Sequence, residues 1–223
     1  MHKTKKHYII FSHGFGVQKD DRGLFTDIAN SLDGIESVMF NYNNINEEEN
    51  TLTVAPLNVQ ASKLEEEIEK IKNKEPEAII DIIAHSQGCL VAAIAEPENI
   101  RKTIFLAPPS EPGMEDLMEY FKNKPNSKVD TEGESRLSRR DGSTTIVPKE
   151  YWKTLKVLAV PKLYNNLSKK TNLIIVQAAD DEVLGFTNFS GVDNVRIETM
   201  RANHDFTEKA RKGLIEFIKK EIC

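Results

Sequence analysis

The sequence predicts an α/β fold in which a mostly parallel sheet is covered by helices on both faces. Short apolar runs of strand length, such as residues 78–83, alternate with longer segments of helical periodicity. Outside residues 108–168, no hairpin turn joins one apolar run to the next, so consecutive strands are expected to be parallel. The length of 223 residues suits one sizeable domain, which we expect to span 1–223.

Each expected element follows from a local pattern. Strands are expected where short apolar runs end at turn-forming residues, at 8–11, 37–42, 78–83, 104–106, 173–176 and 195–199. Helices are expected at 24–32, 57–71, 89–95 and 205–222. In the second of these, the apolar residues that share one face are Leu57, Ala61, Leu64, Ile68 and Ile71. The polar residues 43–50 are predicted to form a loop.

Residues 108–168 interrupt the alternation of strands and helices. The stretch begins with Pro108-Pro109 and ends in a helix-like run. Between them, residues 136–147 read as strand, turn and strand around Asp141-Gly142, which predicts a β-hairpin. We therefore expect an insertion at about 108–168 that sits on top of the sheet as a lid or cap.

Composition narrows the class of protein. Hydrophobic residues make up 39% of the chain and charged residues 29%, as in ordinary globular proteins, and the formal net charge of −5 gives no electrostatic reason to expect a nucleic-acid partner. No apolar stretch is long enough for a signal peptide or a membrane span, so we expect no membrane association. Cys89 and Cys223 do not suggest a disulfide, and a cytoplasmic protein is expected.

The first candidate catalytic residue is Ser86, in Ala84-His85-Ser86-Gln87-Gly88. A serine held in a sharp turn between a strand and a helix needs small neighbours, because the backbone is strained and packs closely. The usual pattern is G-x-S-x-G, and here alanine takes the place of the first glycine. The flanking apolar segments supply the expected strand and helix, so Ser86 is predicted to be a nucleophile instead of a simple helix cap.

A second motif, His13-Gly14-Phe15-Gly16, follows the first expected strand. Glycines let a loop aim backbone N–H groups at a developing oxyanion, and the expected donors are the N–H groups of Phe15 and Gln87. The rival interpretation is a dinucleotide-binding loop, but the third glycine of that pattern would fall at Lys19. His13 is expected to be structural, hydrogen-bonded beneath the loop.

The candidates for the acid and the base of a catalytic triad follow the later expected strands. Asp180 and Asp181 follow one expected strand, and His204 lies between the last strand and the last helix. Adjacent carboxylates point in different directions, so only one should reach the histidine. Asp205 is expected to cap the final helix. No histidine spacing resembles a zinc site and no phosphate-binding loop is present in the sequence, so no metal or cofactor is expected.

These segments resemble those of α/β-hydrolases, in which the triad follows the order Ser, Asp, His. Residues 13–15, 85–88 and 106–108 are similar to small bacterial carboxylesterases, including cinnamoyl or feruloyl esterases, and residues 176–182 resemble their acid loop. The resemblance implies the α/β-hydrolase fold and ester hydrolysis through an acyl-serine intermediate. In that register Asp181 is the acid and Asp180 the alternative. Two departures are Ala84 and the many charges of the insertion, at Arg136, Arg139, Arg140 and Asp141.

The insertion is expected to set the substrate. Tyr151 and Trp152, together with Tyr120, Phe121 and Tyr164, are candidates to line an acyl or aryl pocket, or else to anchor the insertion to the sheet. Because the insertion lacks a long apolar face, small-molecule esters of short acyl or aromatic acids are favoured over insoluble lipid. Thioester or amide cleavage by the same triad is an alternative. A binding protein without catalytic activity is the alternative from another class.

Overall fold

The main sheet confirms the predicted α/β class. The computed structural model describes residues 5–139 and 141–223, so Arg140 lies outside the described residues. Six parallel strands follow the order β10-β9-β6-β5-β1-β2. Their bounds are β1 (His7–Ser12), β2 (Glu36–Met39), β5 (Ile79–His85), β6 (Lys102–Leu106), β9 (Asn172–Ala178) and β10 (Arg196–Met200). Each lies at or next to a run predicted from the sequence.

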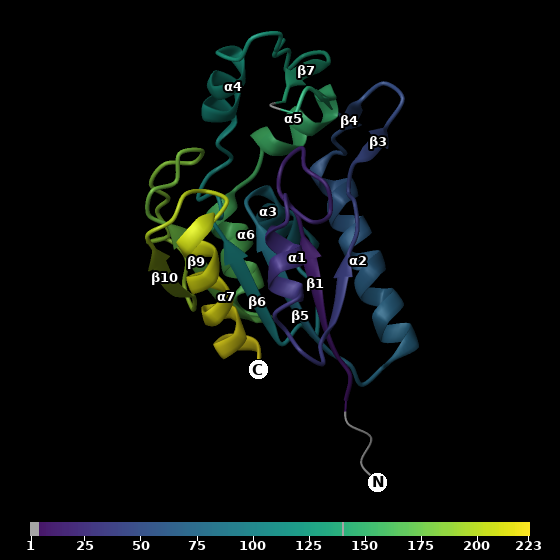
Figure 1. The fold of residues 1–223 in the computed structure, drawn as a ribbon, viewed down its shortest axis with the longest axis vertical. Coiled ribbons are helices and arrows are strands. Elements are labelled where there is room, and N and C mark those ends of the chain that lie inside the picture. The colour runs from purple at the N-terminus through teal and green to yellow at the C-terminus, as the bar shows by residue number, and fades with distance from the viewer. Residues whose placement is uncertain (1–4, 140) are drawn as a thin grey trace.

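Helices cover both faces of this sheet (Figure 1). One core, which includes Leu64 and Tyr164, lies under α2 (Leu57–Lys74), α3 (Gln87–Ala95) and α6 (Val160–Leu167). The other includes Phe25 and Leu214 and lies under α1 (Leu24–Ala29) and α7 (Glu208–Ile222). Parallel strands buried on both sides are apolar along most of their length, and β5 and β6 show this pattern.

A second, four-stranded sheet corrects one prediction. Residues 43–50, predicted as a loop, include β3 (Asn44–Asn46), which pairs with β4 (Thr51–Thr53). The predicted hairpin is present as β7 (Ser135–Ser138) and β8 (Thr144–Val147), and β4 pairs with β8 to give the order β3-β4-β8-β7. The loop prediction was wrong because β3 is polar and depends on pairing with distant strands, which no local pattern reveals.

The small sheet, α4 (Met114–Lys122) and α5 (Lys149–Lys156) lie beyond the carboxyl ends of the main strands (Figure 1). The expected insertion therefore divides in two. Its last helix, α6, packs on α3 within the helical layer, whereas the earlier part joins β3 and β4 above the sheet. We call β3, β4 and residues 108–159 the upper layer.

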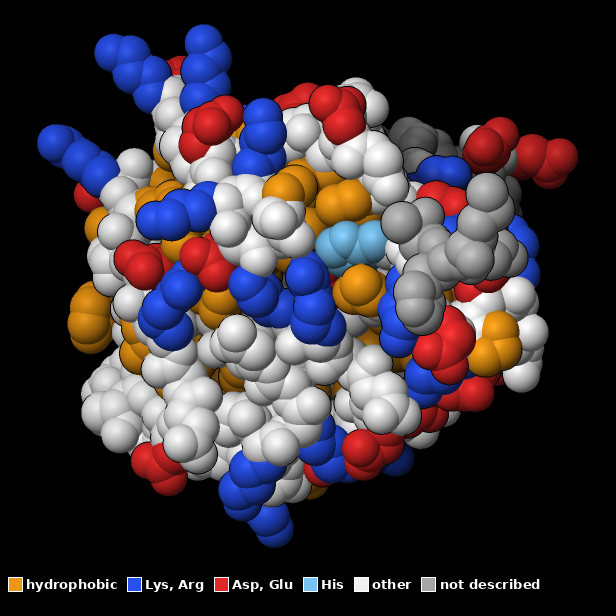
Figure 2. All heavy atoms as spheres, turned by 90° about the horizontal axis from the view of Figure 1, so that it is seen from below, with side chains coloured by type: hydrophobic (Ala, Val, Ile, Leu, Met, Phe, Trp, Pro, Cys, Tyr) orange, Lys and Arg blue, Asp and Glu red, His pale blue; other side chains and the backbone are white. Residues whose placement is uncertain are grey.

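The end of the molecule opposite the upper layer carries lysine and arginine side chains interspersed with aspartate and glutamate (Figure 2). The face visible there thus carries no continuous patch of one sign among the described residues. Cys89 is buried, Cys223 is exposed, and both are free. Within the described ranges, no helix is both long enough and apolar enough to cross a membrane.

Candidate active site

Ser86 occupies a strained turn between β5 and α3. Its φ of 52° and ψ of −125° lie outside the regions that L-residues ordinarily adopt. A side chain at Gly88 would bring its Cβ within 2.0 Å of the Ser12 carbonyl oxygen, so only glycine fits there. Ala84 lies fully buried between β1 and β6, where a methyl group is accommodated. The turn therefore needs the second glycine of the motif and tolerates alanine at the first.

The structure brings the three predicted triad residues together. His204 Nε2 lies 2.9 Å from Ser86 Oγ, and His204 Nδ1 lies 2.7 Å from Asp181 Oδ2. An ionised carboxylate can only accept, so Nδ1 carries the hydrogen and Nε2 accepts from the serine hydroxyl. Burial alone would raise the pKa of Asp181, but the hydrogen bond and charge of His204 outweigh it and lower this pKa. Asp181 is therefore ionised at neutral pH and orients His204 with Nε2 toward Ser86.

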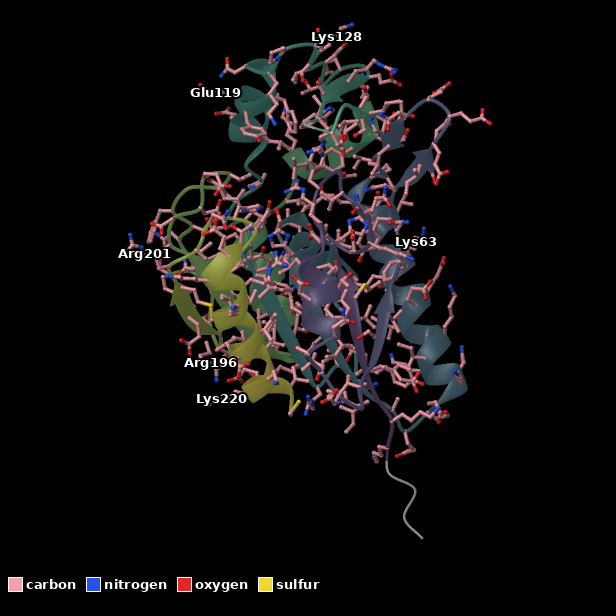
Figure 3. All side chains as sticks on the ribbon, in the orientation of Figure 1. Lys63, Glu119, Lys128, Arg196, Arg201 and Lys220 are labelled. Carbon is pink, nitrogen blue, oxygen red and sulfur yellow. The ribbon has the colours of Figure 1, made fainter. Side chains whose placement is uncertain are left out.

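The neighbouring acids make different contacts. Asp181 Oδ1 accepts the N–H groups of Val183 and Leu184, each at 2.8 Å, which fixes the carboxylate in its loop. The Asp180 side chain is 62% exposed and lies 3.6 Å from Arg201, which projects from the outside of the molecule (Figure 3). Of the two adjacent aspartates, the geometry thus brings Asp181 to the histidine. Glu182 accepts the His204 backbone N–H at 3.0 Å.

The expected oxyanion donors are unoccupied. Within the described residues, no hydrogen bond uses the N–H of Phe15 or that of Gln87. The N–H of Gly14 is instead taken by Asp21 Oδ2 at 2.9 Å. His13 is buried beneath the loop, where its Nε2 accepts the Tyr42 N–H at 3.1 Å. This contact matches the structural role expected for His13.

A buried acid–histidine pair that no sequence motif predicted lies beside His204. His85 Nδ1 lies 2.7 Å from Asp21 Oδ2, and His85 Nε2 lies 3.0 Å from the His204 carbonyl oxygen. Burial would lower the pKa of His85, but the Asp21 charge outweighs it and raises this pKa. The pair links Gly14 of the expected oxyanion loop to the backbone of the candidate base. Asp21 sits in a turn with φ 47°, and no sequence motif marks it.

The expectation that Asp205 caps the final helix was wrong. The helix begins at Glu208, its N-cap residue is Thr207, and no side chain caps it. Asp205 Oδ2 instead accepts from Arg22 at 2.6 Å. Two residues separate Asp205 from the helix, so its carboxylate does not reach the first free N–H groups and pairs with Arg22 instead.

A cavity of about 820 Å³ opens over Ser86, between the main sheet and the upper layer. Tyr151, Tyr120 and Phe121 line it, as does Arg139 from the β7–β8 turn. Trp152 is directed away from it, and its indole N–H donates to Ser135 at 3.1 Å. The structure thus brings Tyr151, but not Trp152, to the cavity. From the sequence, Arg139 was only one of several charges of the insertion.

Tyr151 is also part of a polar chain that joins the upper layer to the main helices. Its hydroxyl donates to Gln87 Oε1 at 2.6 Å, and Gln87 Nε2 donates to Gln60 Oε1 at 2.8 Å. Gln60 in turn donates to the Ala55 carbonyl at 2.6 Å. All three side chains are buried, so each amide orientation is fixed by its partners.

The side chains of His85, His204 and Asp205 approach one another closely enough to suggest a cation site, with candidate ligand atoms within 4.8 Å. Each imidazole nitrogen, however, already has a hydrogen-bond partner. The Asp205 carboxylate is paired with Arg22. The residues therefore fit a hydrogen-bonded network better than a metal centre.

Comparison with known proteins identifies the fold. No protein-family model matches the sequence, and no curated protein matches it. Among solved structures, Est1E from Butyrivibrio proteoclasticus with ferulic acid bound aligns with a TM-score of 0.70 and 18% identity, over 99% of this chain and 89% of that chain. An esterase domain from Rhodothermus marinus aligns at 0.68 and 15%, over 99% and 88%. A monoacylglycerol lipase from Paleococcus ferrophilus aligns at 0.62 and 13%, over 96% and 93%.

The chain therefore has the α/β-hydrolase fold, as its sequence motifs predicted. At sequence identities of 13–18%, the similarity to these structures establishes the fold alone. Function lies in the residues of a site and not in the fold that carries them.

Proposed function

We propose that the protein is a serine hydrolase that cleaves carboxylic esters through an acyl-serine intermediate. The observation that carries this proposal is the continuous chain from Ser86 Oγ through His204 to Asp181, with contacts of 2.9 and 2.7 Å, at the floor of a cavity. The strained Ser86 backbone supports the same assignment, because it costs stability and presents the hydroxyl to that cavity.

The proposed chemistry follows from these contacts. Ser86 Oγ attacks the ester carbonyl while its proton passes to His204 Nε2, and the Asp181 carboxylate stabilises the imidazolium. The N–H groups of Phe15 and Gln87 stabilise the oxyanion. His204 then delivers the proton to the leaving alcohol oxygen. In the second half-reaction His204 takes a proton from water while the water oxygen attacks the acyl carbon. The bond between Ser86 Oγ and the acyl carbon then breaks, the carboxylic acid leaves, and His204 returns the proton to Ser86 Oγ.

We further propose that the upper layer acts as a cap that limits the substrate to short acyl or aromatic esters. Aromatic side chains line the cavity, and Tyr151 fixes part of its wall through Gln87. The similar Est1E has been seen with ferulic acid bound, which agrees with an aromatic acid in a cavity of this kind. Trp152, which the sequence suggested as a substrate contact, anchors the cap in this proposal.

A fluorophosphonate probe tests the proposal directly. We expect one covalent adduct by intact mass on the wild type and none on Ser86→Ala or His204→Ala. Ser31→Ala is the matched control, because its hydroxyl bonds the Ile28 carbonyl on a distant helix, and labelling should persist. A panel of esters, thioesters and amides then separates the possible activities. Folded wild type that takes no adduct and cleaves nothing in the panel would favour a binding protein.

A further inference from the structure

Two cations face the candidate active-site cavity without an acidic partner. Arg139 donates through Nε to Thr145 Oγ1 at 2.7 Å, and through Nη2 to the carbonyls of Phe15 and Gly16 at 3.2 and 3.0 Å. Lys124 Nζ donates to the Tyr120 hydroxyl at 2.8 Å. Neither makes an ion pair with any described residue, and the Arg139 Nη1 group makes no hydrogen bond there either.

The two cations flank one aromatic ring. Lys124 Nζ lies 5.2 Å from the centre of the Phe121 ring, and the Arg139 guanidinium carbon lies 5.3 Å from it. Both side chains line the same cavity as Ser86. Both charges therefore lie against Phe121, in the wall of the cavity that also contains the proposed nucleophile.

The acids that line the cavity are mostly engaged elsewhere. Asp21 is paired with His85, and Asp205 with Arg22. Asp141 Oδ1 accepts both the N–H and the hydroxyl of Ser143. Glu182 accepts the His204 N–H, while Asp20 is half-buried and Glu47 is exposed. The cavity thus offers positive charge beside Phe121. Asp141 attracts Arg139 electrostatically, but within the described residues it forms no ion pair with it, so the guanidinium keeps room for a bound carboxylate.

The loop that contains Phe15 and Gly16 fixes the position of Arg139. A Cβ at Gly16 would lie 1.8 Å from Arg139 Nη2, so glycine is required for the guanidinium to reach the loop carbonyls. Burial lowers the pKa of Arg139 to about 10, which reflects the cost of holding this charge partly out of water. An anion in the cavity would relieve that cost, because a guanidinium binds a carboxylate through charge-assisted hydrogen bonds.

We propose that the substrate carries a carboxylate besides the ester that is cleaved, and that Arg139 and Lys124 bind this carboxylate. The inference rests on the proposed ester hydrolysis and names its substrate class, monoesters of dicarboxylic acids. Arg139 provides the directional contact and Lys124 adds charge on the other side of Phe121. Neither residue takes part in the bond-breaking steps.

Two esters that differ only in charge test this inference. One is p-nitrophenyl hydrogen adipate and the other is its neutral methyl ester; release of p-nitrophenol above the rate without enzyme reports the same bond in both. We expect the ratio of kcat/KM, anionic over neutral, to be about 10 to 100 in the wild type, the value of one hydrogen bond to a charged group. The preference should appear mainly in KM, and should shrink as salt is added.

The variants assign the preference to its residues. Arg139→Gln should bring the ratio close to one, and Lys124→Gln should lower it by a smaller factor. Lys128→Gln is the matched control, since Lys128 is an exposed cation on the outside of the upper layer and does not line the cavity (Figure 3), and the ratio should stay at the wild-type value. Because Arg139 also ties down the Phe15 loop, the ratio is compared and not the absolute rate. Arg139→Lys keeps the charge and should keep part of the preference.

Three results would overturn the inference. They are a wild-type ratio at or below one, a ratio that survives in Arg139→Gln, and loss of the ratio in Lys128→Gln. If any of these results is observed while the neutral ester is still cleaved and the fluorophosphonate still labels Ser86, ester hydrolysis stands and only the carboxylate site falls. If neither ester is cleaved and no adduct forms, the proposed function falls as well.

Discussion

The buried pair of Asp21 and His85 supports a quantitative prediction. Both ring nitrogens of His85 face oxygens that can only accept, the Asp21 carboxylate and the His204 carbonyl. Each nitrogen must carry a hydrogen, so His85 is an imidazolium paired with an aspartate, and both side chains are 2% exposed. Replacing His85 by glutamine leaves the Asp21 charge buried without a cation. Breaking a buried pair in this way costs about 3–5 kcal/mol of unfolding free energy.

The pH dependence of this contribution follows from the two pKa shifts. The raised pKa of His85 means that its share of the stability is complete below about pH 6.5, the unfolded value, and is lost as the pH rises through the folded value. Burial would raise the pKa of Asp21, but His85 and the Gly14 N–H outweigh it and lower this pKa. Its share is therefore complete above about pH 4 and is lost in more acidic solution.

The double variant Asp21→Asn/His85→Gln is the proper reference, because it has no ionisable group at either position. The free energy of unfolding of the wild type should exceed that of the double variant by the largest amount between about pH 4 and 6.5. Above that range the difference should decline by up to about 1.4 kcal/mol per pH unit. Urea unfolding at pH 5.5 and 8.5 measures the free energy of unfolding of the wild type, of His85→Gln and of the double variant. The fluorescence of Trp152, the single tryptophan, follows each transition.

Two outcomes would refute this reasoning. One is the same difference in unfolding free energy between wild type and double variant at both pH values. The other is a loss of less than about 1 kcal/mol of unfolding free energy in His85→Gln. The matched control is His7→Gln, at the opposite end of the sheet. His7 also contacts a buried acid, Asp81, at 2.8 Å, but Asp81 keeps Arg101 as a partner when His7 is removed. That variant should lose less than about 1 kcal/mol and keep its esterase activity.

Three further predictions concern the site and its support. Asp181→Asn should lower kcat by about three to four orders of magnitude, whereas Asp180→Asn, at a 62% exposed side chain, should change the hydrolysis rate of p-nitrophenyl acetate less than twofold. Gly88→Ala should lose about 3 kcal/mol or more in urea unfolding, since its Cβ would lie 2.0 Å from a β1 carbonyl oxygen; a small loss would show that the turn can relax. Tyr151→Phe removes the hydroxyl that Gln87 accepts from at 2.6 Å and should cost about 1–3 kcal/mol by the same assay; no loss would mean that the amide finds another partner.

What could be predicted from the sequence is what depends on neighbouring residues. The apolar run of β5, the small residues around Ser86 and the turn at Asp141-Gly142 each act within a few positions, and the structure places an element at each. The loop after a parallel strand also has a fixed place, at the carboxyl edge of the sheet. For that reason the loops carrying Asp181 and His204 could be expected to meet near the serine before any coordinates were known.

What could not be predicted depends on contacts between distant parts of the chain. Asp21 reaches His85 across 64 positions, and Arg139 reaches Phe15 across 124. β3 is polar and is held by pairing with β4, which in turn pairs with β8. No periodicity marks such residues. Their role exists only once these distant segments of the chain are folded together.

The contacts of Phe15 link the upper layer to the proposed chemistry. Its carbonyl accepts from Arg139 at 3.2 Å, and its ring packs against those of Tyr151 and Phe121, with centres 5.4 and 6.1 Å away. If its N–H is an oxyanion donor, displacing the upper layer moves a group that acts mainly in the transition state. Phe121→Ala should then lower kcat more than it raises KM, in steady-state assays on a neutral ester. A rise in KM alone would mean that the upper layer only encloses the substrate.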